Sequence, residues 1–156
     1  MPLEIERKYT VINDGWRSQA IGSHYVQGYL SLDPERTVRV RRVADQAWLT
    51  IKGRSRGMVR SEYEYPIPPE HAGELLGMCL QPLIEKTRYR VMHAGLTWEV
   101  DVFSGDNAGL VIAEIELESA SQVPELPAWV GEEVTDDVRY YNASLVRHPY
   151  RLWHEA

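Results

Sequence analysis

The chain has 156 residues, a net charge of −6 and one cysteine, Cys79. Its length suits one hydrophobic core, so residues 1–156 are expected to form a single domain. The acidic balance argues against a nucleic-acid partner, and the lone cysteine excludes an internal disulfide. Neither a secretion signal nor an apolar run of about 20 residues is apparent, so we expect a cytoplasmic protein without a membrane partner.

Polar and apolar residues alternate with a period of two over most of the chain, which predicts strands. The turns between these segments are short, so neighbouring strands should pair antiparallel as hairpins. The predicted strands are 3–11, 24–31, 36–43, 47–53, 58–67, 83–93, 96–103 and 109–119. Eight such strands indicate a mainly β protein (α+β overall) and suggest a closed eight-stranded antiparallel barrel, whose interior can hold one small ligand.

A few short helices are predicted between and after the strands. Pro68 and its neighbour open a helix of about ten residues with apolar side chains on one side. Short helical turns are expected after Asp14 and around Trp129. Thr135 is predicted to be the N-cap of a C-terminal helix, which Pro149 ends.

One phase of the alternation is ionic, and the other is mostly apolar. Successive side chains of a strand point to opposite faces, so each strand should have one charged and one apolar face. The charged phase contains eight basic and nine acidic residues: Glu4, Glu6, Lys8, Arg39, Arg41, Lys52, Arg60, Glu62, Glu64, Lys86, Arg88, Arg90, Glu99, Asp101, Glu114, Glu116 and Glu118.

Two interpretations of the charged face remain open from the pattern. It could be the solvent side of a half-buried sheet, which is the norm for charged side chains. Alternatively it lines the inside of a barrel, and helices, loops or the partner chain of a homodimer cover the apolar outside. The three lysines of the chain favour the interior, because Lys8, Lys52 and Lys86 all fall in the charged phase and none in a loop or helix.

The acidic residues of this phase are grouped in pairs two residues apart. The pairs are Glu4 with Glu6, Glu62 with Glu64, Glu99 with Asp101 and Glu114 with Glu116. Two carboxylates at this spacing lie on one face of a strand, where they can share a hard cation such as Mg²⁺ or Mn²⁺. A bound polyanion with its metal ions would balance both sets of charges.

The segment Glu4-Ile5-Glu6-Arg7-Lys8 resembles the Glu-x-Glu-x-Lys signature of the CYTH, or triphosphate tunnel metalloenzyme, superfamily. Further segments resemble that family in the same order along the chain. These are 27–30, 38–41, 50–53, 62–64, 85–89, 99–103 and 113–117. The segment 131–135, with Arg139, Tyr140 and Asn142, resembles the short bacterial members.

The resemblance implies an eight-stranded tunnel with a triphosphate inside, and it assigns roles to the charged residues. The residues expected to bind the phosphates are Lys8, Arg39, Arg41, Lys52, Lys86 and Arg88. Two Mg²⁺ or Mn²⁺ ions are expected, held by Glu4, Glu6, Glu114 and Glu116 and supported by Glu62, Glu64, Asp101 and Glu118. Glu6 is assigned to the attacking water, and Lys52, Lys86 and Tyr29 are counted with it as catalytic. Tyr29 could equally be an ordinary strand aromatic.

The expected activity is hydrolysis of inorganic triphosphate (tripolyphosphate) to pyrophosphate and phosphate. A class IV adenylate cyclase and a thiamine or nucleoside triphosphatase are the alternatives within the superfamily. A phosphate-chain or nucleotide-binding module without catalysis is the alternative outside the enzymes. Cys79 is expected to be a buried thiol rather than a nucleophile.

Overall fold

The computed structural model describes residues 3–153, apart from the side chain of Gln19, and contains nine strands in that part of the chain. The strands are β1 (Leu3–Val11), β2 (Gly22–Ser31), β3 (Thr37–Val43), β4 (Gln46–Lys52), β5 (Val59–Ile67), β6 (Leu80–His93), β7 (Leu96–Phe103), β8 (Val111–Glu116) and β9 (Val130–Glu133). Their order in the sheet is β5-β4-β3-β2-β6-β7-β8-β1-β9. The eight strands that the alternation predicts are therefore confirmed, with ends that differ by a few residues.

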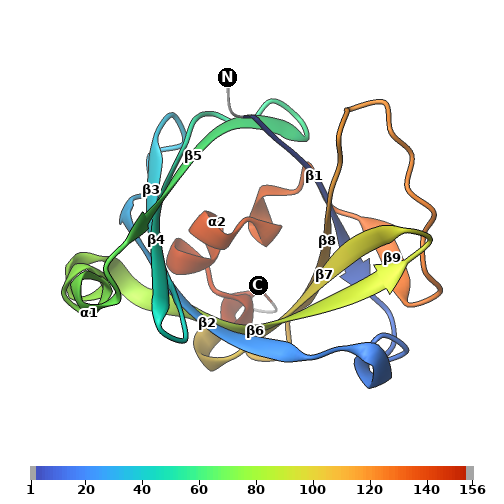
Figure 1. Cartoon of the computed structure of the whole chain (residues 1–156), viewed down its shortest axis with the longest axis horizontal. Helices are drawn as coiled ribbons and strands as arrows, with labels where there is room; N and C mark the ends of the chain where they lie inside the picture. Colours follow the sequence, from blue (N-terminus) through green and yellow to red (C-terminus); the bar gives the residue numbers. More distant parts are fainter. Residues whose placement is uncertain (1–2, 154–156) are drawn as a thin grey trace.

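Strand β1 closes the sheet into a barrel (Figure 1). One edge of β1 pairs with β8, so that Glu6 faces Glu116 and Lys8 faces Glu114. The other edge is shared between two partners: residues 3–5 pair with β5, and the end of the strand pairs with β9. All these pairings are antiparallel, which confirms the closed eight-stranded antiparallel barrel and adds a ninth strand to it.

The helical segments are short and lie outside the barrel wall or at its end. They are η1 (Arg17–Gln19), α1 (Pro69–Met78), η2 (Gly105–Asn107), η3 (Val138–Tyr140), α2 (Asn142–Arg147) and η4 (Tyr150–Leu152). The helix predicted from Pro68 is α1, which begins with a proline in its first turn. Its Ala72 and Leu76 pack with Cys79 against Val40 and Ala47 on the outer surface of the barrel. Cys79 is buried, as expected.

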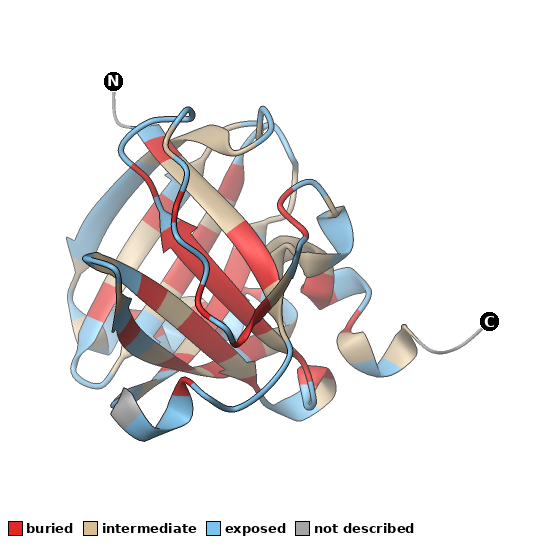
Figure 2. Cartoon of the chain, turned by 90° about the vertical axis from the view of Figure 1, so that its right-hand side faces the viewer, coloured by how far each residue is buried: buried red, intermediate tan, exposed pale blue. Residues whose placement is uncertain are grey.

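The apolar phase of β1, β7 and β8 faces outwards and is covered by the segment that joins β8 to β9. Trp98 is fully buried between Tyr9 and Trp129, with ring centroids 5.5 Å and 5.8 Å away. In β8 four consecutive residues, 112–115, are buried, so both faces of this strand are removed from water (Figure 2). The cover removes the apolar face from water within one chain, and the homodimer that was one alternative for this cover is not tested by it.

Helix α2 lies across one end of the barrel. In Figure 1 it is seen behind the barrel opening, and in Figure 2 it lies at the side from which the chain runs to its C-terminus. Leu145 and Val146 of α2 pack against Ile84, Phe103 and Ile112 at this end. The same end of the barrel is therefore closed by an apolar contact between α2 and the strand ends.

The predicted capping role of Thr135 is wrong. Its hydroxyl accepts a hydrogen bond from the backbone N–H of Lys8 at 3.1 Å and so satisfies the edge of β1 instead of a helix. The cap of the following 3-10 turn is Asp137, whose carboxylate accepts from the backbone N–H of Arg139. Tyr141 then adopts an extended backbone conformation, so that α2 begins only at Asn142.

The prediction of a helical turn around Trp129 is correct for the turn but wrong for the helix. Trp129 lies in a turn, but the chain leaves it directly as strand β9. Val130 pairs with Val11, and the backbone N–H of Ile12 donates to the carbonyl of Trp129 at 2.9 Å. This segment therefore pairs with the part of the β1 edge that β5 leaves free.

Within residues 3–153, no helix combines the length and the apolar character that crossing a membrane would require.

Candidate active site

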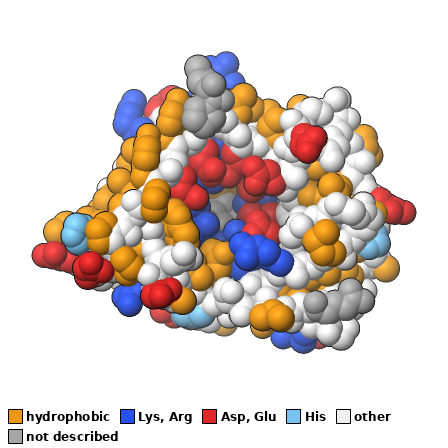
Figure 3. Space-filling view, in the orientation of Figure 1, with side chains coloured by type: hydrophobic (Ala, Val, Ile, Leu, Met, Phe, Trp, Pro, Cys, Tyr) orange, Lys and Arg blue, Asp and Glu red, His pale blue; other side chains and the backbone are white. Residues whose placement is uncertain are grey.

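The charged phase of the strands faces the inside of the barrel, around a cavity of about 460 Å³. Figure 3 shows acidic and basic side chains side by side around the hollow at the end opposite α2. The charged residues of its lining are Glu4, Glu6, Lys8, Arg39, Arg41, Lys52, Arg60, Glu62, Glu64, Lys86, Arg88, Glu99, Glu114, Glu116 and Arg147. The structure therefore confirms that the charged face lines the inside of the barrel and is not the solvent side of a half-buried sheet.

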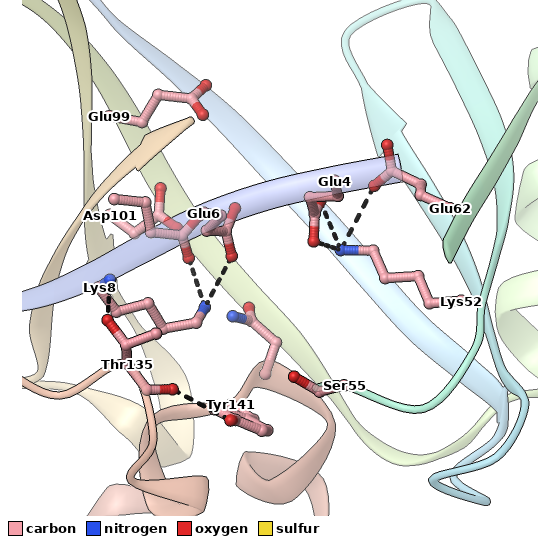
Figure 4. Close-up of polar contacts among 12 residues, drawn as sticks. Glu4, Glu6, Lys8, Lys52, Ser55, Glu62, Glu99, Asp101, Thr135 and Tyr141 are labelled. Atoms are coloured by element: carbon pink, nitrogen blue, oxygen red, sulfur yellow. Dashed lines mark hydrogen bonds and ion pairs between the residues drawn. The ribbon is translucent and has the colours of Figure 1, made fainter. Parts of the chain in front are cut away.

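Lys8 of β1 and Lys52 of β4 are each held by carboxylates from β1 and its neighbouring strands (Figure 4). Lys8 Nζ lies 2.8 Å from Glu114 Oε1 and 3.5 Å from Glu6 Oε1. Lys52 Nζ donates to both oxygens of Glu4 at 3.0 and 2.9 Å. Burial works to lower the pKa of Lys8, but the Glu114 and Glu6 charges outweigh burial and raise that pKa above its ordinary value. Lys8 is therefore a permanent cation.

A second group of cations surrounds the fully buried Asp101. Its Oδ1 accepts from Arg88 Nε at 2.7 Å, and its Oδ2 accepts from Arg88 Nη2 and Lys86 Nζ at 2.8 Å each. Burial lowers the pKa of Lys86 to about 7, because the attraction of Asp101 is opposed by the charges of Arg88 and Arg41. Asp101 is saturated by these bonds and holds the two cations in position.

Strand β3 contributes two arginines to the same cavity. Arg39 Nη2 lies 3.2 Å from Thr50 Oγ1 and 3.5 Å from Glu64 Oε2. Arg41 donates through Nε to Gln27 Oε1 at 3.1 Å. Burial and the neighbouring charges of Arg39 and Arg88 lower the pKa of Arg41 to about 10. This crowding of cations indicates a site that is completed by an anion.

Carboxylates on the paired strands β1 and β8 lie close together, so that their negative charges repel one another. Burial, with the Glu114 charge next, raises the pKa of Glu6 to about 7. Burial also raises the pKa of Glu116, and the charges of Glu4 and Glu6 add to this effect. A cation between β1 and β8 would relieve the repulsion.

The donor set fits a hard divalent cation, although no ready-made cage exists. Among residues 3–153, no three His, Cys, Asp or Glu side chains are already arranged to hold a metal ion. Mg²⁺ usually takes only one or two protein carboxylates and completes its shell with water and substrate phosphate. Glu6 and Glu116, which face each other in register, supply oxygens of this kind.

The structure brings most of the predicted site residues to the cavity, with two exceptions. Tyr29, Glu62 and Glu64 all line it. Asp101 points into the barrel but is fully buried beneath Lys86 and Arg88, so it reaches the cavity only through the cations that it binds. Glu118 is exposed, follows the last residue of β8 and is not part of the cavity lining.

Other lining residues are absent from the predicted site. Arg60 and Glu99 belong to the charged phase of the alternation, so the sequence pattern contained their signal. Thr37 and Asn142 also line the cavity but are uncharged, and Asn142 comes from α2 rather than from a strand. Thr37 shares the face of Arg39 and Arg41, although it carries no charge, whereas Asn142 lies outside any period-two pattern.

Comparison with known proteins agrees with this geometry. The CYTH domain family model matches residues 2–150. An inorganic triphosphatase of Acetivibrio thermocellus is 49% identical over 156 residues, covering 99% of this chain and 100% of that protein. An inorganic triphosphatase of Nitrosomonas europaea is 36% identical over 148 residues, covering 91% of this chain and 95% of that protein.

A solved structure adds a comparison in three dimensions. The crystal structure of an inorganic triphosphatase has a TM-score of 0.64 and 33% sequence identity with this chain, covering 91% of this chain and 96% of its own. The match of the family model along nearly the whole chain, together with relatives above one third identity, shows that the chain belongs to the CYTH domain family.

Proposed function

We propose that the protein is an inorganic triphosphatase that hydrolyses tripolyphosphate to pyrophosphate and phosphate inside the barrel, with Mg²⁺ or Mn²⁺ as the metal. The observation that carries this proposal is the cavity of about 460 Å³, in which cations and carboxylates cover different parts of one wall. A compact polyanion with its metal ions matches both parts at once. The two curated relatives that are 49% and 36% identical have the same activity in their names.

In this proposal the cations of the cavity bind the phosphate chain. Lys8 and Lys52 act as point charges, whereas Arg39, Arg41 and Arg88 can each bind two phosphate oxygens in a forked geometry. Lys86 completes the set: Lys8, Arg39, Arg41, Lys52, Lys86 and Arg88. Asp101 keeps Lys86 and Arg88 pointed along the wall, and we assign it this positioning role. Phosphoryl transfer needs positioning and charge neutralisation more than a covalent nucleophile, which this set can supply.

The carboxylates of β1 and β8 have the complementary role. Glu4, Glu6, Glu114 and Glu116 are the proposed metal-binding residues, and Glu62 and Glu64 support them from β5. When bound, the metal neutralises phosphate charge and makes a water molecule more acidic. Glu6 is the carboxylate that we assign to the attacking water, because its pKa of about 7 in the free protein suits a group that exchanges protons near neutral pH.

The proposed activity can be tested by comparing substrates. Purified protein is incubated with tripolyphosphate, ATP or thiamine triphosphate in the presence of Mg²⁺ or Mn²⁺, and every product is identified. We expect kcat/KM to be highest for tripolyphosphate, because the lining of the cavity is dominated by charged side chains that match a bare phosphate chain.

Other outcomes would identify another member of the superfamily or a binding protein. Cyclic AMP with pyrophosphate from ATP would overturn the proposal in favour of an adenylate cyclase. Preferred turnover of thiamine triphosphate would identify that substrate instead. Tight binding of tripolyphosphate without turnover of any substrate would make the protein a binding module.

A further inference from the structure

A pair of side-chain amides connects helix α2 to two cations of the cavity. Gln27 of β2 points into the barrel but is fully buried and does not line the cavity, whereas Asn142, the first residue of α2, lines it. Gln27 Oε1 accepts from Arg41 Nε at 3.1 Å, and Gln27 Nε2 donates to Asn142 Oδ1 at 3.0 Å. Asn142 Oδ1 also accepts from Lys86 Nζ at 3.2 Å.

The chemistry of the two cations fixes the orientation of both amides. Arginine and lysine side chains have only donors, so each must meet an amide oxygen. Gln27 therefore turns its oxygen to Arg41 and its NH₂ group to Asn142. Asn142 must then present its oxygen to both Gln27 and Lys86. No other orientation of the two amide groups gives Arg41, Lys86 and the NH₂ group of Gln27 an acceptor each.

This orientation leaves the NH₂ group of Asn142 available. Within residues 3–153 it has no hydrogen-bond partner, and the side chain belongs to the lining that also contains Lys86, Arg88 and Arg41. Two N–H donors held rigidly beside three cations form a site for an anionic oxygen. A phosphate oxygen of a bound triphosphate would accept from this donor.

We propose that Asn142 is a further substrate-binding residue, whose NH₂ group donates to a phosphate oxygen of the triphosphate while Gln27 holds it in that orientation. The proposal rests on the proposed function in taking tripolyphosphate as the ligand. It gives α2 a contact with the substrate in addition to its apolar contact with the barrel end.

Two substitutions separate this role from a purely structural one. Asn142→Asp keeps the shape of the side chain and an oxygen for Gln27 and Lys86, but it replaces the NH₂ donors by a second oxygen. If Asn142 only supported Lys86, the aspartate would serve as well as the asparagine. If Asn142 donates to the substrate, the aspartate repels the phosphate. Asn142→Ala removes both functions.

The experiment measures binding and turnover for the wild type and both variants. The affinity for tripolyphosphate is determined by calorimetry with EDTA present, which excludes turnover, and kcat and KM are determined with Mg²⁺. We expect the affinity and kcat/KM of Asn142→Ala to fall about tenfold to a hundredfold, the range for a hydrogen bond to a charged group. Asn142→Asp is expected to lose at least as much. Gln46→Glu, an equal change of charge at an exposed position outside the cavity lining, is the control and should match the wild type.

The outcomes distinguish this inference from the proposed function. Wild-type affinity and kcat/KM in Asn142→Asp, with an unchanged unfolding midpoint, would overturn the role of Asn142 and leave the triphosphatase intact. A wild-type protein that binds tripolyphosphate without hydrolysing it would overturn the proposed function, and the calorimetric comparison would still decide the role of Asn142.

Discussion

Glu6 shows how a site arranged to bind a metal ion and a polyanion lowers the folding stability of the free protein. Its pKa is raised to about 7 by burial and by the charges of Glu114 and Glu4, against the attraction of Lys8. The unfolded chain has no such crowding, so its carboxyl has the ordinary pKa of 4.5. The folded protein therefore binds a proton at Glu6 more tightly than the unfolded chain does, and its stability decreases as the pH rises between these two pKa values.

Replacing Glu6 by glutamine removes this loss, because the amide stays neutral. We expect Glu6→Gln and wild type to be equally stable below pH 4.5 as far as this group is concerned. The free energy of unfolding of the variant should exceed that of the wild type increasingly up to pH 7, and by a constant amount above it, on the order of 1–3 kcal/mol. Urea denaturation in EDTA at several pH values measures the difference.

The same variant should have lost tripolyphosphate hydrolysis, because the carboxylate assigned to the attacking water is gone. Full activity would remove Glu6 from the mechanism. A stability difference that does not change with pH would show that Glu6 is not strained in the free protein.

At the scale of residues, the sequence pattern predicts which charged side chains belong to the site, but it does not predict the uncharged polar ones. The alternation places Lys8, Lys52 and Lys86 on one face, and the structure confirms that this face is the interior. Gln27 and Asn142 have no such signal, since a neutral amide occurs equally at surfaces, turns and sites. Their role depends on contacts between segments 115 residues apart, which no local pattern contains.

At the scale of elements, the strands were predictable because both faces of each strand are specified by side chains. β9 has only four residues and no sustained alternation, so it was missed. Thr135 has the residue type of a helix cap, but tertiary structure decides which backbone N–H it meets, and that N–H belongs to Lys8. Local propensity identifies a capping residue without identifying its partner.

Helix α2 has only six residues and is held by packing rather than by its own helix propensity. Leu145 is fully buried against the barrel end, so Leu145→Ala should lower the free energy of unfolding by about 2–5 kcal/mol. Since α2 carries Asn142, the KM for tripolyphosphate should rise as well. Chemical denaturation and steady-state kinetics measure the two effects.

Leu126→Ala is the matched control, because Leu126 is 49% exposed in the segment that joins β8 to β9. Its effect should be below about 1 kcal/mol, with an unchanged KM. If Leu145→Ala behaved like this control, the apolar contact of α2 would not hold the end of the barrel in place.

At the scale of the whole molecule, the barrel has its charges inside and its apolar faces under α1, α2 and the segment before β9. Periodicity alone leaves the direction of the charged face open, because a half-buried sheet and a filled tunnel have the same alternation. The family resemblance supplied the direction. The reason is physical: the direction depends on what covers the apolar face, and the contacts between the strands and the covering segments are tertiary contacts that the alternation within a strand does not contain.

A cavity with crowded cations should be stabilised by its polyanion. We expect tripolyphosphate in EDTA to raise the unfolding temperature, with a gain of about 2.7 kcal/mol at one hundred times the dissociation constant. Sulfate at equal ionic strength is the control for unspecific salt effects, and it should have a much smaller effect. An equal shift with both anions would show that the cavity does not recognise a phosphate chain.

The position of α2 across one end of the barrel also affects where the substrate enters and where the products leave. Because α2 covers the opposite end, we expect the substrate to enter and both products to leave mainly through the opening seen in Figure 3. Pyrophosphate has to leave before the next triphosphate arrives, so the product competes with the substrate for a single route. A long polyphosphate chain could insert only its end into the cavity, so we expect the enzyme to prefer short chains.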